Sequence, residues 1–291
     1  NLFTLRCEFY KSMVLVKTIK ELQEYLMELR NNSSVGFVPT MGALHSGHLS
    51  LVNQAVRENS VVVVSIFVNP NQFNDADDLK RYPRNLEADL KLLEPTGCDL
   101  VFAPEAEEIY PEPDTRKFNF GQLEQVMEGK HRPGHFNGVA QVVSRLFEIV
   151  KPNKAYFGLK DFQQLAIINK LVKMLRLPVE IVPCPIIREE SGLAMSSRNE
   201  LLSAEERESA SLIFKTLSRA KNLIGTKSVR ELENWVIETI NKNRFLNVEY
   251  FEIVDFENLQ PVTSWRDKGK KIGCIAVFCG KVRLIDNIVL N

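Results

Sequence analysis

The segment VGFVPTMGALHSGHLSLVNQAVRENSVVVVSIFV, residues 35–68, indicates the fold class of this chain. Residues 35–39 form a compact apolar run and residues 61–68 a nearly continuous one, as expected of strands that are buried on both faces. Between them, residues 47–59 carry apolar side chains at helical spacing. A strand, a helix and a second buried strand in this order are the repeating unit of a parallel sheet.

The alternation of strands and helices continues along the first two-thirds of the chain. Strands are predicted at residues 98–103, 155–158 and 179–182, and helices at residues 86–93, 138–150 and 162–175. We therefore expect residues 13–187 to form a Rossmann-like α/β domain, with helices on both faces of a parallel sheet. Because ligands of such sheets bind at the carboxyl ends of the strands, functional residues should follow strands directly. The charged residues 75–81 are expected to form a solvated loop.

The pattern changes after residue 187. Ser203 and Glu206 have the spacing of a capping box, which predicts the start of a helix. Helical patterns run on to residue 223 and again over residues 229–241, and strands are predicted at residues 248–254, 271–278 and 282–290. A tight turn at residues 279–281 joins the last two strands. We expect residues 188–291 to form a smaller α+β domain.

Composition excludes several classes of protein. The 291 residues include 37 Lys and Arg against 37 Asp and Glu, so no net charge attracts nucleic acid or an anionic membrane. No apolar run approaches the ~20 residues that span a bilayer. Residues 1–12 precede the pattern that begins at Met13, and we expect them to be a leader or extension. We expect reduced, buried thiols in a cytoplasmic protein, because no zinc or redox spacing joins the five cysteines, Cys7, Cys98, Cys184, Cys274 and Cys279.

The first candidate site is PTMGALHSGH, residues 39–48, which follows a strand and opens a helix. A helix N-terminus offers amide donors to phosphate, and Gly47 lets a nucleotide lie close to the backbone. His45 and His48 lie three residues apart and should face the same side, where they can donate hydrogen bonds to phosphate oxygens during adenylyl transfer. The alternative is a structural turn with two incidental histidines.

The second candidate site is Met195-Ser196-Ser197-Arg198, in a loop beyond the last strand of the sheet. Two adjacent hydroxyls and a guanidinium suit a triphosphate, and a loop of this kind can close over ATP. The same residues could equally form the cap of the following helix.

Together the two segments resemble the HIGH and KMSKS signatures of adenylyl-transferring enzymes. Within that superfamily the sequence closely resembles the pantothenate synthetase (pantoate–β-alanine ligase) family. The resemblance is carried by six ordered stretches: residues 37–48 (FVPTMGALHSGH), 68–73 (VNPNQF), 82–84 (YPR), 131–143 (HRPGHFNGVAQVV), 157–164 (FGLKDFQQ) and 195–199 (MSSRN). Six matches in order are far more specific than any one of them.

The resemblance implies a two-step reaction. The carboxylate of pantoate attacks the α-phosphate of ATP to give pantoyl adenylate and pyrophosphate, and the amine of β-alanine then gives pantothenate and AMP. The partners implied are small molecules, without nucleic acid or membrane. The resemblance also implies Mg²⁺ held mainly by phosphate oxygens rather than by a metal site of the protein, and a homodimer formed through the larger domain.

The family's roles carry over to matching positions. The catalytic group would be His48, with His45 beside it, together with Lys160, Ser196, Ser197 and Arg198. The ATP site would comprise Met41, Gly42, Ala43, Leu44, His45, Ser46, Gly47, His48, Gly158, Leu159, Lys160, Asp161, Ile187, Met195, Ser196, Ser197 and Arg198. The pantoate site would comprise Pro39, Met41, Gln72, Val142, Val143 and Gln164, and Gln72 would also contact β-alanine.

These residue types suit the chemistry. Amide side chains both donate and accept, so they match the hydroxyls and carboxylate of pantoate, and the apolar residues form a wall for its methyl groups. Asp161 could accept from a ribose hydroxyl or cap the next helix. Arg132 is a candidate for phosphate or product, and Asp89 for magnesium, each against a plain structural role. Leu159 departs from the family, in which this position is often polar.

Three other functions stay open at this stage. A nucleotidylyltransferase shares the H-x-G-H pattern but needs a phosphate pocket in place of Gln72 and Gln164. A tRNA-binding module related to synthetases is disfavoured by the zero net charge. A nucleotide sensor would bind ATP without consuming it.

Overall fold

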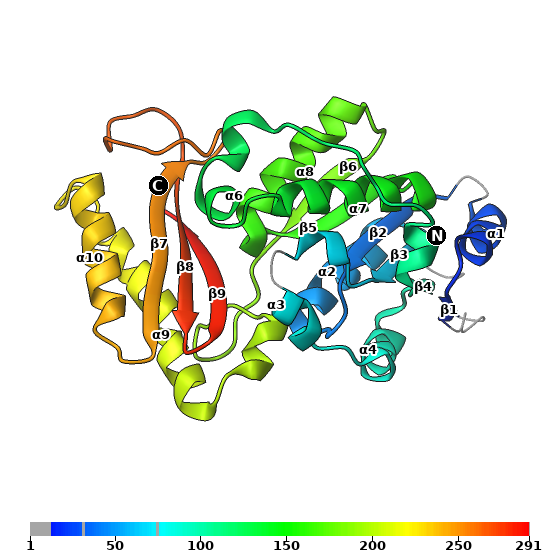
Figure 1. The fold of residues 1–291 in the computed structure, drawn as a ribbon, viewed down its shortest axis with the longest axis horizontal. Helices are drawn as coiled ribbons and strands as arrows, with labels where there is room; N and C mark the ends of the chain where they lie inside the picture. The colour runs from blue at the N-terminus through cyan, green and yellow to red at the C-terminus, as the bar shows by residue number, and fades with distance from the viewer. Residues whose placement is uncertain (1–12, 31–32, 74–75, 291) are drawn as a thin grey trace, which may run out of the picture.

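The computed structural model describes residues 13–30, 33–73 and 76–290 and contains two sheets (Figure 1). The expectation for residues 1–12, and Cys7 with it, lies outside the described residues. The strands of the first sheet are β1 (Val14–Val16), β2 (Val35–Thr40), β3 (Val61–Ile66), β4 (Leu100–Phe102), β5 (Lys154–Gly158) and β6 (Glu180–Cys184). The helices that accompany it are α1 (Ile19–Leu29), α2 (Ser46–Glu58), α3 (Ala76–Arg81), α4 (Leu86–Leu93), α5 (Ala106–Ile109), α6 (Met127–His131), α7 (His135–Val150) and α8 (Phe162–Leu175).

The first sheet has the strand order β1-β4-β3-β2-β5-β6, and all of its pairs are parallel. The chain therefore moves outward from β2 to one side through β3 and β4, and then crosses to the other side at β5. This reversal places a crevice at the carboxyl ends of β2 and β5. The parallel sheet predicted from the sequence is confirmed; the three-residue edge strand β1 had not been predicted.

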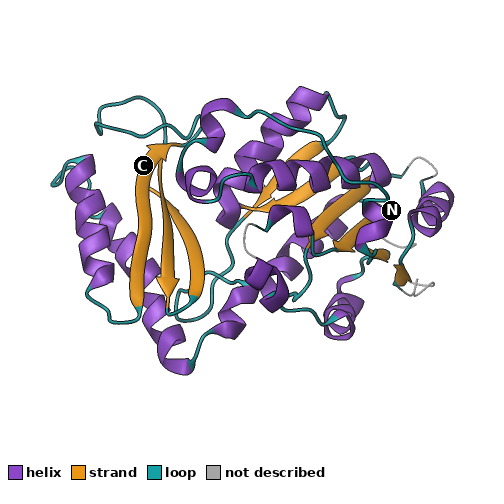
Figure 2. Cartoon of the chain, viewed as in Figure 1, coloured by secondary structure: helices purple, strands orange, loops and turns teal. Residues whose placement is uncertain are grey.

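Helices cover both faces of this sheet (Figure 2). Along β3, Val61 and Val63 pack with residues of α1, α7 and α8. The alternate residues Val62 and Val64 pack with α2 and α4 on the opposite face. Because successive side chains of a strand point to opposite faces, each continuous apolar run feeds two cores. This explains why the strands read as uninterrupted apolar stretches.

One local expectation is wrong. Residues 76–81 form the helix α3, whereas residues 75–81 were expected to be a loop. Leu79, Lys80 and Arg81 are good helix formers, and Asp77 lies 3.9 Å from the Lys80 ammonium one turn later. The charges that suggested a loop therefore form the exposed side of a short helix.

The second sheet is antiparallel, in the order β7-β8-β9, which confirms the predicted α+β character of this part. Its strands are β7 (Leu246–Asp255), β8 (Lys271–Cys279) and β9 (Val282–Val289). The helices α9 (Ala204–Lys221) and α10 (Val229–Asn241) pack on one face, and Ser203 and Glu206 form the predicted capping box. The other face packs against Met127 and Phe162 of the first part.

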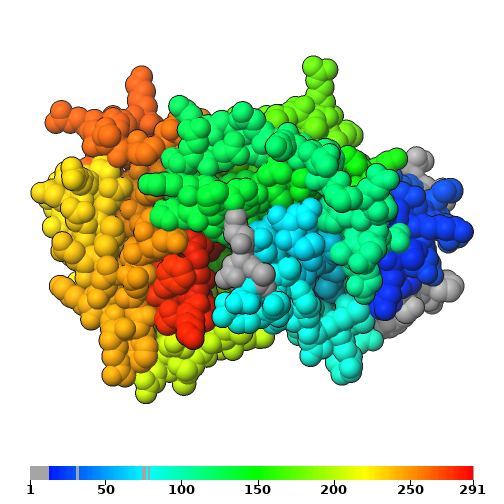
Figure 3. All heavy atoms as spheres, viewed as in Figure 1, coloured from blue at the N-terminus to red at the C-terminus, as the bar shows by residue number. Residues whose placement is uncertain are grey.

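Polar contacts join the two sheets. The Asn287 amide of β9 donates to the carbonyl oxygens of Leu159 and Lys160, at 2.8 and 3.0 Å. Within the second part, Arg188, which follows β6, forms two hydrogen bonds with Asp286 of β9, at 2.6 and 2.9 Å. In the space-filling view, the red residues of β9 lie against the green and cyan surface of the first part (Figure 3). The end of the chain is thus packed beside the crevice.

The described cysteines are buried thiols, as expected from the sequence. Cys98, Cys184, Cys274 and Cys279 are buried and unbridged. Within the described residues, every helix is too short or too polar to span a bilayer.

Candidate active site

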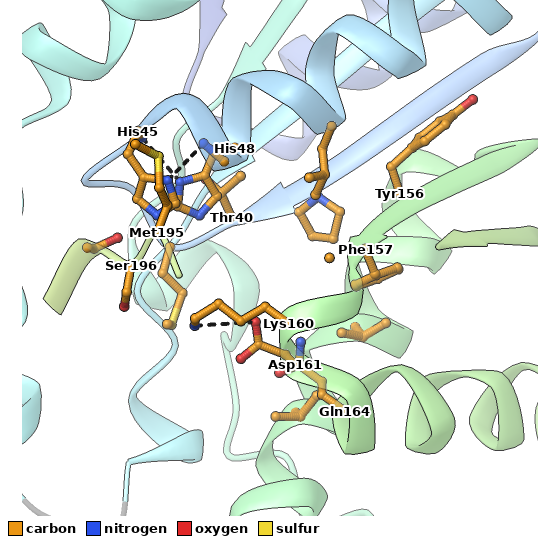
Figure 4. A pocket seen from close by; sticks show the side chains of 18 of the residues that line it. Thr40, His45, His48, Tyr156, Phe157, Lys160, Asp161, Gln164, Met195 and Ser196 are labelled. Atoms are coloured by element: carbon orange, nitrogen blue, oxygen red, sulfur yellow. Dashed lines mark hydrogen bonds and ion pairs between the residues drawn. The ribbon is translucent and has the colours of Figure 1, made fainter. Parts of the chain in front are cut away.

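A cavity of about 230 Å³ lies at the carboxyl ends of β2 and β5, where the strand order reverses. Figure 4 shows His45 and His48 facing Lys160 and Asp161 across it, with Ser196 to one side. Most of the residues proposed from the sequence line this cavity: Pro39, Met41, His45, Gly47, His48, Gln72, Val142, Val143, Gly158, Lys160, Asp161, Gln164, Ile187, Met195, Ser196, Ser197 and Arg198. Gly42, Ala43, Leu44, Ser46 and Leu159 were proposed as well, but they do not line it.

The loop between β2 and α2 is held from behind by Asp89. Gly42 has a φ of 81°, and the next residue, Ala43, has a φ of 48°, a left-handed conformation that is uncommon outside glycine. The Asp89 carboxylate accepts hydrogen bonds from the amides of Ala43 and Leu44, at 3.0 and 2.7 Å. A Cβ at Gly42 would lie 3.0 Å from Asp89 Oδ2. Asp89 is thus a buried support of the loop, which agrees with the structural alternative, although the sequence did not indicate the loop as its partner.

His45 and His48 form the N-terminal cap of α2. The Gly47 amide donates to His45 Nδ1 at 3.1 Å, and the His45 amide donates to His48 Nδ1 at 3.4 Å. This is a capping box in which imidazoles replace the usual serine and glutamate. Since a backbone amide can only donate, Nδ1 of each ring is an acceptor and the proton of each neutral ring lies on Nε2.

Both rings are neutral near pH 7. Burial lowers the pKa of His45 to about 4, and the positive charge of Lys160 acts in the same direction. Burial lowers the pKa of His48 to about 3, with further contributions from His45 and Lys160. The ring centroids are 4.1 Å apart, so protonation of one ring disfavours protonation of the other. The pair therefore offers two neutral N–H donors to the cavity.

The Met195–Arg198 segment packs against the loop between β2 and α2. The Met195 amide donates to the Ile187 carbonyl at 2.9 Å, and the Ser197 hydroxyl donates to the Ala43 carbonyl at 2.9 Å. Ser196 Oγ accepts from the Arg198 amide at 3.3 Å and caps the 3₁₀ helix η5 (Ser197–Leu201). Capping and cavity lining are therefore combined in one segment, while Ser203 caps α9.

Lys160 and Asp161 belong to the 3₁₀ helix η4 (Leu159–Asp161), directly after β5. The Lys160 ammonium lies 3.9 Å from the Asp161 carboxylate, and both side chains line the cavity. Asp161 occupies the N-cap position of α8, as the capping interpretation predicted, but its side chain makes no capping hydrogen bond. Leu159 packs its side chain into the apolar cores and gives its carbonyl to Asn287. Leu159 is therefore an inward-facing apolar residue and not a side chain of the cavity.

Amide groups and apolar side chains also line the cavity. Gln72 ends the 3₁₀ helix η1 (Pro70–Gln72); its Nε2 lies 2.8 Å from Met41 Sδ and its Oε1 accepts from Asn69 at 3.3 Å. Val142 and Val143 present methyl groups from α7. Arg132 instead lines a second, smaller cavity of about 70 Å³, where its guanidinium lies 3.5 Å from the Glu128 carboxylate.

Sequence reasoning gave no role to eleven lining residues: Thr40, Leu51, Phe67, Asn69, Tyr82, Val139, Leu146, Tyr156, Phe157, Pro185 and Ile186. Two of them had a usable signal. Asn69 is polar, follows β3 closely and is 1% exposed, and Tyr82 begins the YPR stretch. The remainder are mostly apolar residues, whose sequence pattern is that of an ordinary core.

The charge distribution favours an anionic ligand. Lys160 and Arg198 line the cavity with the two neutral imidazoles, and Asp161 is the one carboxylate among its described lining residues. The described part of the chain contains no group of three or more His, Cys, Asp or Glu that could hold a metal ion. Both Asp89 oxygens already accept amide hydrogens. This donor set fits a magnesium ion that keeps phosphate and water ligands, which is the usual preference of Mg²⁺.

Comparison with known proteins identifies relatives along nearly the whole chain. The profile of the family described as pantoate-beta-alanine ligase matches residues 14–289. The pantothenate synthetase of Phocaeicola vulgatus is 59% identical over 278 residues, covering 95% of this chain and 99% of the relative. That of Bacteroides fragilis is 57% identical over 277 residues, covering 95% and 98%.

Solved structures agree. The pantothenate synthetase of Thermus thermophilus superposes with a TM-score of 0.89 at 45% identity, covering 96% of this chain and 99% of the other. The pantoate-beta-alanine ligase of Francisella tularensis, solved in complex with beta-gamma ATP and beta-alanine, has a TM-score of 0.81 at 37% identity, covering 96% and 98%. A full-length sequence match and the same fold, with both signature segments at one cavity, lead to one conclusion: this chain belongs to the pantoate–β-alanine ligase family.

Proposed function

We propose that this chain catalyses the ATP-dependent condensation of (R)-pantoate with β-alanine to pantothenate, through pantoyl adenylate, with release of AMP and pyrophosphate. The observation that carries this proposal is the mixed lining of one cavity. Neutral imidazoles, Lys160 and Arg198 line it together with the Gln72 amide and the apolar side chains of α7. An anionic nucleotide and a small hydroxy acid can thus meet in one chamber.

In the first step, an oxygen of the pantoate carboxylate attacks the α-phosphorus, and the bond to the bridging oxygen of pyrophosphate breaks. Negative charge grows on the phosphate oxygens as this occurs. His48 and His45 would donate their Nε2 protons to these oxygens, and the Lys160 ammonium would neutralise the departing charge. Because the rings already have the correct tautomer, no rearrangement is needed during the reaction.

Pantoate would be held by Gln72 and Gln164, whose amide groups can both donate and accept. Val142 and Val143 would contact its two methyl groups. In this arrangement the carboxylate would face the nucleotide. Two reactants held in one geometry need no further encounter, which accounts for a large part of the rate enhancement in such reactions.

In the second step, the amine nitrogen of β-alanine attacks the acyl carbon of the adenylate, AMP leaves, and the nitrogen loses a proton. Gln72, which lines the cavity, would contact the incoming amine as well as pantoate. The solved Francisella relative was crystallised with a β,γ-ATP ligand and β-alanine, which supports this pair of substrates.

Magnesium would be held mainly by the phosphate groups and water, close to the Asp161 carboxylate. Once bound, it would neutralise phosphate charge. We place the protein in the cytoplasm, a reducing compartment that suits its buried, unbridged described cysteines. We also propose a homodimer.

The segment beyond residue 187 would act as a lid that brings Ser196, Ser197 and Arg198 over ATP. The hydrogen bonds from Asn287 to the carbonyl oxygens of Leu159 and Lys160 supply the contacts by which its movement would reach the site. Structures with and without nucleotide should therefore differ in the angle between the two sheets; an unchanged angle would contradict the lid.

A product assay by mass spectrometry tests the reaction. Incubation with ATP, pantoate and β-alanine should yield pantothenate, AMP and pyrophosphate, and no ADP. Omission of β-alanine should leave pantoyl adenylate bound and pyrophosphate released. Absence of AMP would contradict the proposal, and a product that keeps the nucleotide would favour a nucleotidylyltransferase instead.

A further inference from the structure

We propose that His135 is a positioning residue for Gln72, holding the main chain of η1 so that the Gln72 amide faces pantoate. The inference rests on the proposed role of Gln72 in the pantoate site. His135 itself lines the second cavity, not the one that holds Gln72, so it would act on the substrate only through its neighbour.

The contact is direct and has a defined direction. His135 Nδ1 lies 2.8 Å from the Gln72 carbonyl oxygen, and His135 Nε2 lies 3.1 Å from the Arg132 guanidinium. A carbonyl can only accept and a guanidinium can only donate. The ring is therefore neutral, with its proton on Nδ1 directed at Gln72 and its Nε2 lone pair directed at Arg132.

The surroundings keep the ring in this state. His135 is 7% exposed, and burial lowers its pKa to about 4, with the charge of Arg132 acting in the same direction. Arg132 is in turn oriented by the Glu128 carboxylate, 3.5 Å away, which Arg283 of β9 holds at 2.9 Å. The orientation of His135 is thus fixed by an ion-pair chain that begins on the second sheet.

Gln72 needs such support because η1 is only three residues long. Its side chain contacts a methionine sulfur, a weak acceptor, and one amide at 3.3 Å, neither of which fixes a direction strongly. Gly138, one turn after His135, has no Cβ; a Cβ there would lie 2.8 Å from the Gln72 Cα. The first turns of α7 therefore pack closely on the main chain of η1. Asn69, which caps η1, donates to the Gly138 carbonyl at 3.1 Å, and His135 supplies the hydrogen bond to Gln72 itself.

Two substitutions of similar size separate the two ring nitrogens. In His135→Asn the side-chain NH₂ lies near the position of Nδ1 and can still donate to Gln72. In His135→Gln the amide extends to the position of Nε2, so it can meet Arg132 but loses the donor near Gln72. His131→Asn is the matched control, because His131 lies four residues earlier and lines neither cavity.

We expect His135→Gln and His135→Ala to raise the KM for pantoate by about 5- to 10-fold, the effect of one lost hydrogen bond, and the KM for ATP by less than about 2-fold. His135→Asn should restore the pantoate KM to within about 2-fold of the wild type. The control should match the wild type in both constants. Thermal unfolding of each variant shows whether it is folded, and the Asn and Gln variants remain comparable even if His135→Ala is not.

The outcomes separate this inference from the function on which it rests. If Gln72→Glu raises the pantoate KM but His135→Gln does not, Gln72 binds pantoate without help from His135 and the inference is wrong. Equal rises in the KM for pantoate and for ATP in both the Asn and Gln variants would show a general structural role and would also overturn it. If Gln72→Glu leaves the pantoate KM unchanged, the proposed pantoate site itself is wrong.

Discussion

The hydroxyl of Ser197 donates a hydrogen bond of 2.9 Å to the carbonyl oxygen of Ala43. This bond joins the two segments that resemble nucleotide-binding signatures, although more than half of the chain separates them. It holds the Met195–Arg198 segment against the loop that positions His45 and His48. The two signatures are therefore one structural unit.

Removal of this hydroxyl should weaken the nucleotide site. We expect Ser197→Ala to raise the KM for ATP by about 5- to 10-fold, the scale of one hydrogen bond, measured by initial rates of AMP release. Ser211→Ala is the control, since Ser211 is also buried but bonds within α9. Equal effects of the two substitutions would show that the Ser197 bond has no special role.

His48 should be needed for the adenylation step. We expect His48→Ala to slow adenylate formation by ~10²–10³-fold, the effect of removing one donor to a developing charge. His48→Gln keeps an N–H near the position of Nε2 and should recover part of that loss. The measurement is pyrophosphate release in a single turnover, and an unchanged rate would remove His48 from the catalytic group.

The pH dependence of stability follows from the neutral histidine pair. The pKa of His48 is about 3 in the folded chain, whereas an unfolded histidine titrates near its ordinary value of 6.5. Below pH 6.5 the unfolded chain binds more protons than the folded chain. The free energy of unfolding therefore falls by about 1 kcal/mol for each unit by which the pH is lowered between these two pKa values. Urea unfolding at pH 7 and pH 5 should show this loss, and His48→Gln should show less of it. A loss of the same size in the variant would contradict a neutral, buried His48.

Asp89 should support both stability and nucleotide binding. We expect Asp89→Asn to lower the free energy of unfolding by about 1–3 kcal/mol, because the new NH₂ group faces an amide that needs an acceptor. The KM for ATP should rise as the Gly42–Ala43 turn loosens. Glu87→Gln is the control on the same helix, because the Glu87 side chain is 81% exposed. A stable Asp89 variant with normal ATP binding would show that the Gly42–Ala43 turn does not depend on the Asp89 carboxylate.

Much of the fold was predictable because its periodicity is strong. The strands that carry the site read as unbroken apolar runs, and α4 and α8 have the bounds predicted from the sequence. By contrast, β1 has three residues and α3 six, which is too short for a periodic signal. The structural reason is that such elements are determined by their neighbours, as β1 is by its pairing with β4.

The site was predictable where chemistry follows a strand and not where it depends on packing. His45, His48 and Lys160 lie directly after strands, and their residue types indicate phosphate. Asp89 and His135 reach the site only through other residues, across separations of 45 and 63 positions. Local sequence contains no signal for such a contact. Their roles therefore became visible only once the helices were packed.

In the capping box of α2, the two nitrogens of each imidazole have different roles. Nδ1 stabilises the first turn of the helix and Nε2 carries the only ring proton, so neither ring has a lone pair directed at the cavity. A soft or borderline metal such as Zn²⁺ needs such a lone pair, and to bind here it would have to reverse the tautomer and break the cap. The capping contacts of the H-x-G-H motif thus disfavour ligation of a transition metal by these rings without any steric barrier.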